Sequence, residues 1–332
     1  AIRNRGRVDN RDTFLDTDDQ ERARGITIFS KQAVFPLGDW EVTLLDTPGH
    51  VDFSAEMERT LSVLDYAVLI VSGADGVQGH TETLWRLLKR YQVPVFLFVN
   101  KMDQPGTDRA ALLKELKKRL SDTCVAFDQE GRNEAEWQEE IAMCDEHLLE
   151  GYLSGNPIEE NQIREMIRAR KLFPCYFGSA LKGQGVEELL EGIHAYARCW
   201  EKDGEKEGEK DGLGARVYKI SRDEQGSRLT HLKILSGILK VKDTISGKQG
   251  EEKVNQIRIY SGSKYETVSQ AEPGCICAVT GLDGTWAGQA IGEAAEGELP
   301  LLEPVLTYQI RLPEGCDAHV ALLKLRQLEE EE

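Results

Sequence analysis

The sequence lacks any long run of apolar residues. Its longest, residues 93–99, has seven residues, whereas a helix that crosses a bilayer needs about 20. No membrane-spanning helix is therefore expected. The basic residues at the start are followed by no apolar segment, so no secretory signal peptide is predicted.

Cysteines are few and unpatterned. There are seven, an odd number, and only Cys275 and Cys277 lie close together in the sequence. This arrangement is neither a disulfide framework nor a zinc-binding pattern, so we expect reduced thiols and a cytoplasmic protein.

Positive charge is also in deficit. The chain has 41 Lys and Arg residues against 58 Asp and Glu residues, which gives a formal net charge of −17. A protein that holds nucleic acid by bulk charge is thereby excluded, and any basic surface must be local.

With 332 residues, 40% of them hydrophobic and 30% charged, the composition is that of a globular protein of about two domains. We expect a monomer.

The first part of the chain alternates strand-like and helix-like segments. The strand-like segments are Trp40–Leu45, Tyr66–Val71, Val93–Val99 and Phe173–Phe177. Apolar residues recur at helical spacing over 84–91 and 186–193, so each of these helices has one apolar face. The order predicts an α/β domain over residues 1–200, with a parallel sheet and helices on both faces.

Three later changes of pattern predict the domain organisation. Residues of about 122–172 interrupt the alternation and are expected to be a helical insertion. Residues 201–211 include nine charged residues in eleven, which predicts a solvated linker over 201–212. Short alternating segments separated by glycines then predict a small β-barrel over 213–302. A strand at Val305–Leu312 and a helix at Ala318–Leu328 would begin an α+β domain, over 303–332, that the chain does not complete.

The segment Asp46-Thr47-Pro48-Gly49-His50 follows the first predicted strand. Ligands of parallel α/β sheets bind at the carboxyl ends of strands, and there a carboxylate can hold Mg²⁺. The Gly49 N–H has no side chain in its way and can approach a terminal phosphate, while His50 would face the attacking group. Taken alone, the segment could equally be a Pro-Gly turn capped by aspartate.

Two further segments follow later strands. In Asn100-Lys101-Met102-Asp103, Asn100 and Lys101 can frame a base, and the Asp103 carboxylate can accept two N–H bonds from guanine. Adenine lacks that pair of donors, so the carboxylate would select the base. The segment 178–182, with Ser179 and Ala180, offers backbone N–H groups to the guanine carbonyl. Each segment by itself could be a turn with a helix cap.

Taken together and in this order, the three segments resemble motifs of the translational GTPases. Arg24-Gly25-Ile26-Thr27-Ile28 resembles the first switch of that family, which implies that the Thr27 hydroxyl binds Mg²⁺. The resemblance further implies Asp46 as a second Mg²⁺ ligand, His50 as the residue that orients the hydrolytic water, and GTP and GDP as ligands. The fold implied is a GTPase-like sheet of the P-loop class.

Longer stretches are most similar to tetracycline-resistance ribosomal protection proteins, which are relatives of elongation factor G. These stretches are 62–65, 75–78, 100–108 and 228–237. The resemblance implies ribosome-dependent GTP hydrolysis, with ribosomal RNA and proteins as partners. Two alternatives remain open at this point: a non-catalytic ribosome-binding module, and an elongation factor G or release-factor GTPase without a role in drug protection.

The sequence contains no phosphate-binding loop of the form GxxxxGK[ST]. Gly247-Lys248 is followed by Gln249, so the lysine and the hydroxyl ligand of that loop are absent. We expect the first strand and this loop to be missing from the 332 residues, and the full-length protein to be active.

The chain of 332 residues should therefore bind GTP weakly or not at all, because several contacts to the β-phosphate are missing. Titration with a fluorescent GTP analogue checks this expectation. A submicromolar dissociation constant would contradict it.

Overall fold

The computed structural model describes residues 27, 30–49, 54–128, 133–198, 212–223, 225–247, 250–295 and 309–331. Contacts divide the chain into two units. The first contains the described residues of 1–36, 41–63 and 200–332, and the second contains those of 37–40 and 64–199.

The second unit is built on a four-stranded parallel sheet with the order β3-β4-β6-β5. Its strands are β3 (Ala67–Ser72), β4 (Val95–Asn100), β5 (Cys124–Ala126) and β6 (Phe173–Phe177). All of β4 except its last residue is buried. This agrees with its continuous apolar sequence, because a strand covered on both faces has no polar side to expose.

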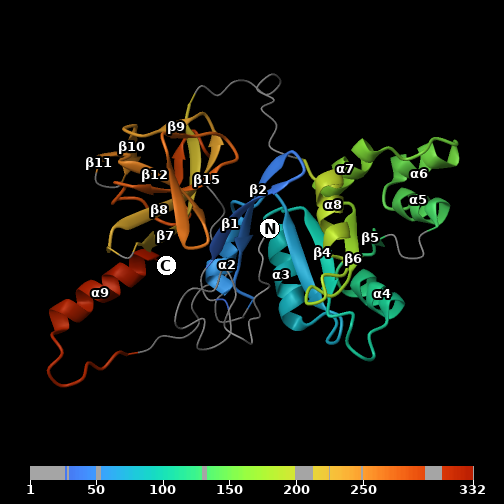
Figure 1. Ribbon diagram of the computed structural model, residues 1–332, viewed down its shortest axis with the longest axis horizontal. Helices are drawn as coiled ribbons and strands as arrows, with labels where there is room; N and C mark the ends of the chain where they lie inside the picture. Colours follow the sequence, from blue (N-terminus) through green and yellow to red (C-terminus); the bar gives the residue numbers. More distant parts are fainter. Residues whose placement is uncertain are drawn as a thin grey trace. The chain divides into compact units, whose positions relative to one another are not determined.

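Helices cover both faces of this sheet (Figure 1). They are α3 (Gly79–Arg90), α4 (Arg109–Arg119), α5 (Glu134–Ala142), α6 (Glu146–Leu153), α7 (Glu160–Arg168) and α8 (Val186–Tyr196). The side chains of strand β6 show that both faces of the sheet are covered. Phe173 packs edge-on against Trp85 of α3, whereas Tyr176 points into a core shared with Ile163 of α7 and Leu189 of α8. The predicted parallel sheet with helices on both faces is confirmed.

The segment of about 122–172 contains a strand as well as helices. Residues 124–126 form β5, which pairs with β6 in the sheet, and α5, α6 and α7 follow. Strand β5 was not predicted from the sequence, because three residues are too few to show the two-residue alternation of a strand.

The predicted strand Trp40–Leu45 exists, but its place in the parallel sheet was wrong. It is β2 (Trp40–Asp46), and it forms a separate two-stranded sheet with β1 (Lys31–Leu37). In β2, polar Glu41 and Thr43 alternate with apolar residues, and none of its residues is fully buried. That alternation is typical of a strand in a half-exposed sheet rather than of one covered on both faces.

The first unit contains an antiparallel β domain. A six-stranded sheet has the order β13-β12-β15-β8-β7-β16, and two pairs of short strands accompany it. The bounds are β7 (Gly214–Arg222), β8 (Arg228–Ser236), β9 (Leu239–Lys240), β10 (Thr244–Gly247), β11 (Gly250–Lys253), β12 (Gln256–Ser261), β13 (Lys264–Val268), β14 (Gln270–Ala271), β15 (Ile276–Thr280) and β16 (Ala290–Gly292). Inward residues of these strands, among them Val217, Leu232 and Ile257, form one core. The β domain predicted after the parallel one is confirmed, and it is antiparallel. Its closure into a small barrel stays a prediction.

The described part of the first unit also contains the helices α2 and α9. Helix α2 (Ser54–Leu61) follows β2, and α9 (Ala318–Glu331) is the helix predicted at 318–328. The strand predicted at 305–312 is not found in its described half, where Ile310 and Leu312 are exposed and outside any strand. The linker expected at 201–212 lies, except for Gly212, outside the described residues. In the described segments, no helix combines the length and apolar character that a bilayer span requires.

His231 of β8 is half-buried and is held uncharged among its neighbours on β7 and β12. Its Nε2 lies 2.7 Å from the Ser221 hydroxyl, and its ring packs near Tyr218 and Tyr260. Removal from water, and secondarily the charge of Lys219, lower the pKa of His231 to about 3. The folded protein therefore binds this proton less readily than the unfolded chain does, in which the pKa is about 6.5.

The free energy of unfolding should fall as pH falls from 6.5 towards 3, by about 1.4 kcal/mol per pH unit for this one proton. Urea unfolding at pH 7.5 and at pH 5.5 measures the loss. In His231→Gln the difference between the two pH values should shrink by about 1.4 kcal/mol, whereas His147→Gln, a change at an exposed histidine, should leave it unaltered. Equal behaviour of the two variants would contradict the assignment.

Candidate functional site

The loops that follow β4 and β6 lie side by side. Val99 of β4 is in register with Phe177 of β6, and the Gly178 N–H donates to the Val99 carbonyl at 2.9 Å. Beyond the sheet, the Met102 N–H donates to the Gly178 carbonyl at 3.0 Å. Parallel pairing therefore continues into the two loops and brings residues 100–103 next to residues 178–182.

Asn100 joins the two loops through its side chain. Its Oδ1 accepts the Lys101 N–H at 2.8 Å and the Ala180 N–H at 2.9 Å. Lys101 itself has a φ of +64°, a left-handed conformation that is costly for a residue with a Cβ. The local bond from Asn100 helps to hold the chain in that conformation. The Ala180 N–H is already engaged, so a bound base would have to compete with Asn100 for this donor.

Asp103 lies where the two loops meet. Its Oδ2 is 3.4 Å from the Lys182 ammonium, and its side chain is 20% exposed. A hydrogen bond from the Ser179 side chain, and then the Lys182 ammonium, lower the pKa of Asp103 below its ordinary value. The carboxylate is therefore ionised at neutral pH and is a pure hydrogen-bond acceptor.

The loop after β6 leaves no space for a side chain at position 178. A Cβ on Gly178 would lie 2.1 Å from the Gln184 carbonyl oxygen. That close approach lets the Ser179 N–H donate to Gln184 O and the Gln184 N–H donate to Ser179 O, both at 3.0 Å. The turn that carries Ser179 and Ala180 is thus closed by its own backbone.

The two loops together form a small polar site with one negative group. Asp103 supplies a negatively charged acceptor, and Lys182 supplies a cationic group beside it. A planar base with two adjacent N–H donors, such as the N1 and N2 edge of guanine, is complementary to that carboxylate. The predicted residues Asn100, Lys101, Asp103, Ser179 and Ala180 are therefore brought together by the fold.

The remaining predicted residues belong to the first unit. Thr27 and Asp46 are partly buried, and Asp46 is the last residue of β2. Gly49 is exposed, and among the described residues none has an atom within 4 Å of the place where its Cβ would stand. His50, like most of the first switch segment, lies outside the described residues.

The donor chemistry of Thr27 and Asp46 suits magnesium. A hydroxyl and a carboxylate are oxygen ligands, which Mg²⁺ prefers, and Mg²⁺ keeps several waters and needs only one or two protein ligands. Over the described ranges, no group of three His, Cys, Asp or Glu side chains comes together as a preformed metal site. The residues present thus fit a metal that is shared with a phosphate rather than one held by protein alone.

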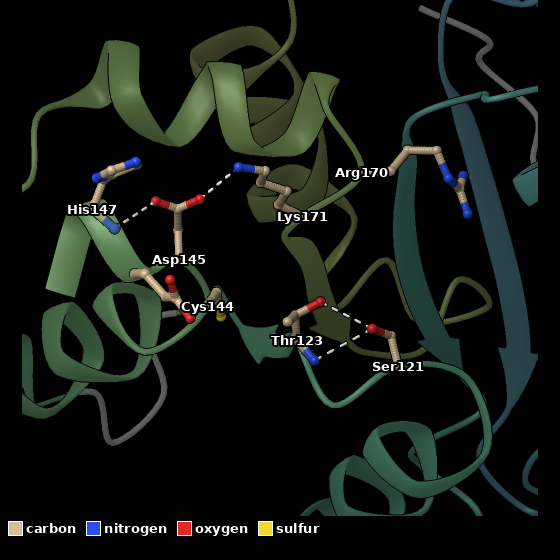
Figure 2. Close-up of a pocket in the computed structure, with 8 residues that line it drawn as sticks. Ser121, Thr123, Cys144, Asp145, His147, Arg170 and Lys171 are labelled. Carbon is tan, nitrogen blue, oxygen red and sulfur yellow. Dashed lines mark hydrogen bonds and ion pairs between the residues drawn. The ribbon is translucent and has the colours of Figure 1, made fainter.

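A cavity of about 560 Å³ lies elsewhere in the second unit, lined by the α4–β5 loop, the α5–α6 turn and the segment after α7. Figure 2 shows Asp145 between the His147 N–H and the Lys171 ammonium, at 3.1 and 2.6 Å. Burial raises the pKa of Cys144 to about 12, so its thiol is not a nucleophile at neutral pH. The Arg170 guanidinium lies over aromatic rings. The cavity contains none of the predicted site residues, and its groups serve the local fold.

Lys182 belongs to the predicted motif 178–182, but no role was predicted for it. The structure places its ammonium at the Asp103 carboxylate, three residues after Ser179 in the same turn. Gln184, whose backbone closes that turn, was not singled out. No sequence signal identifies Gln184, because it contributes only main-chain atoms.

Comparison with known proteins gives two family matches. The model of the elongation factor Tu GTP-binding domain matches residues 1–198, which is more than half of the chain. The model of elongation factor G domain 2 matches residues 213–294, the region of the antiparallel β domain.

Individual relatives agree with these matches. Tetracycline resistance protein TetP of Clostridium perfringens is 33% identical over 315 residues, which cover 88% of this chain and 47% of that protein. Elongation factor G 2 of Syntrophus aciditrophicus is 30% identical, with coverage of 98% of this chain and 58% of that protein. A crystal structure of a protein from Thermus thermophilus has a TM-score of 0.78 at 25% identity, covering 99% of this chain and 56% of that one. The chain spans about half the length of these relatives.

Replacing Asn100 by alanine should lower the free energy of unfolding by about 1–3 kcal/mol, because the Ala180 and Lys101 N–H groups lose their acceptor. Urea unfolding measures the change. Asn161→Ala, at an exposed position of α7, is the matched control and should cost less than about 0.5 kcal/mol. Similar losses in the two variants would show that the loop connection contributes nothing.

Proposed function

The chain belongs to the translational GTPases of the elongation factor Tu and elongation factor G type, and from this premise we propose that the full-length protein hydrolyses GTP on the ribosome. The site residues in this chain would bind the guanine base and the terminal phosphate. The proposal extends to GDP as the product, to ribosomal RNA and proteins as partners, and to a monomer that works in the cytoplasm without a membrane.

One observation carries the proposal: Asp103 is an ionised carboxylate at the junction of the loops after β4 and β6, next to Ser179 and Lys182. Guanine would present two N–H donors to this carboxylate. Adenine would leave the carboxylate without donors and would bring an acceptor nitrogen towards it, which is repulsive. The discrimination between the two purines would thus follow from hydrogen-bond complementarity at a single side chain.

At the phosphate end we propose roles for four residues. Thr27 and Asp46 would hold Mg²⁺, which when bound neutralises charge on the phosphates. The Gly49 N–H would donate to a terminal phosphate oxygen, an approach that the open space around Gly49 permits. His50 would orient the attacking water. Most of the catalysis would come from positioning and electrostatics, because phosphoryl transfer requires little covalent chemistry of the protein.

Replacing Asp103 by asparagine in the full-length protein should change the preferred base. The amide keeps one acceptor and gains a donor, which matches the N1–H and C2 carbonyl of xanthine rather than the two donors of guanine. We expect GTP affinity to fall by about 100-fold or more and XTP affinity to rise. Competition between the two nucleotides for binding measures both effects.

The matched control is Asp108→Asn, five residues further along the same segment. Asp108 caps α4 by accepting the Ala110 and Ala111 N–H groups, and asparagine caps a helix equally well. This variant should therefore keep its preference for GTP. If Asp103→Asn also keeps it, the proposed base recognition is wrong. Specific GTP binding without any ribosome-stimulated release of phosphate would instead favour a non-catalytic ribosome-binding module.

A further inference from the structure

Ser30, three residues after Thr27, is bound by side chains at three of its atoms. Its N–H donates to Glu56 Oε1 of α2 at 3.2 Å, its carbonyl accepts from the Lys219 ammonium of β7 at 3.0 Å, and its hydroxyl lies 2.9 Å from the Thr60 hydroxyl. The Thr60 hydroxyl donates to the Glu56 carbonyl at 3.1 Å, so its single proton is used and the Ser30 hydroxyl is the donor to Thr60.

Lys219 and Glu56 close this arrangement into a triangle. Their charged groups are 2.9 Å apart, and their side chains are only 12% and 17% exposed. An ion pair so shielded from water is little weakened by salt, and removing one partner leaves the other charge without compensation. Ser30 is therefore held from both sides by two groups that also hold each other.

A β-bulge in β7 directs Lys219 towards this triangle. Val217 pairs with Leu232, and Lys219 pairs with the adjacent residue His231, so Tyr218 is the extra residue. Val217 and Ile220 both point into the β-domain core although they are three positions apart, an odd spacing that puts two residues of a regular strand on opposite faces. In a regular strand, Lys219 would share the face of Val217 and would enter that core. The bulge inverts the alternation and takes the ammonium out of the core.

The triangle joins the two segments to which the proposed phosphate chemistry is assigned. Thr27 is three residues before Ser30, which is at most about 11 Å of extended chain. Helix α2, which carries Glu56 and Thr60, begins at Ser54, five residues after Gly49. Both segments are thereby tied to one lysine of the β domain.

We propose that Lys219 is a positioning residue, which with Glu56 fixes Ser30 against α2 and so limits how far Thr27, three residues before Ser30, can lie from that helix. This inference rests on the proposed GTPase function for its kinetic consequence. Lys219 touches neither nucleotide nor metal in this scheme. It acts through Ser30, and the β domain thereby takes part in ordering the phosphate end of the site.

The test uses the full-length protein with Lys219→Met, which keeps an unbranched side chain as far as the ε atom and removes the ammonium, and with Lys219→Arg, which keeps the charge. Lys233→Met is the matched control. Lys233 is a buried lysine on the neighbouring strand β8, and its ammonium donates to the Val63 carbonyl at 2.9 Å rather than to Ser30.

The first readout is hydrogen exchange at the Ser30 amide without nucleotide. Lys219→Met should raise the exchange rate about tenfold, because the Ser30 carbonyl loses the ammonium that it accepts from, and Glu56, which accepts the Ser30 N–H, loses its ion-pair partner. Lys219→Arg should stay within about threefold of the wild type, and Lys233→Met should leave the rate unchanged. An exchange rate in Lys219→Met within a factor of about two of the wild type would overturn the proposal.

The second readout is ribosome-stimulated GTP hydrolysis. Lys219→Met should lower kcat about tenfold and leave KM for GTP within about threefold, since the base-binding loops are unchanged. Faster exchange at Ser30 with an unchanged kcat would also overturn the positioning role. If the wild type itself hydrolyses no GTP, the proposed function fails, and the exchange rates still decide whether Lys219 holds the segment.

Lys219→Met leaves Glu56 without its partner and could prevent folding. The double variant Lys219→Met with Glu56→Gln removes both charges and avoids that defect. It should show the same faster exchange at Ser30 and the same loss in kcat, and wild-type values for both would overturn the proposal.

Discussion

Because β4 and β6 pair in parallel, with Val99 opposite Phe177, the loops that follow them leave the sheet at the same edge and in the same direction. The proposed base-binding part of the site depends on this pairing. Residues about 80 positions apart in sequence are adjacent at their backbones before any side chain contributes. The Asn100 side chain then joins the loops, and the closed turn at Gly178 fixes where Ser179 and Ala180 stand. A carboxylate placed at such a junction has a defined partner, orientation and charge.

The parts of the fold that the sequence predicted correctly are those with a strong local period. Strand β4 is apolar except for its last residue, and α3 and α8 each have one apolar face. The types of these elements and the order of the layers could therefore be predicted from the local pattern. Strand β5 was missed because its pairing with β6, rather than any local pattern, makes it a strand. The placement of β2 was wrong for a related reason. Local propensity identifies a strand, whereas the strand that it pairs with depends on the packing of the folded chain.

The residues of the candidate site likewise differ in whether the sequence alone could identify them. Asn100 and Asp103 could be identified because their chemistry resides in their own side chains and their spacing is short. Lys182 acquires a role only through its distance to Asp103, and Gln184 acts only through its main chain. The network at Ser30 was beyond prediction as well, because it depends on a bulge at Tyr218 that reverses which side chains of β7 face inward. Irregularities of this kind have no reliable signature in a single sequence.

Lys101 has a left-handed backbone, at a φ of +64°. At this position, the residue that would be most stable differs from the residue that the proposed function requires. Glycine would adopt the same conformation without the steric penalty of a Cβ, so a screen that rewards only thermal resistance would tend to enrich glycine there. The Lys101 side chain, which is proposed to frame the base, would be lost in the process. At residue 101, the substitution that would stabilise the fold is therefore the one that would remove the side chain with the proposed function.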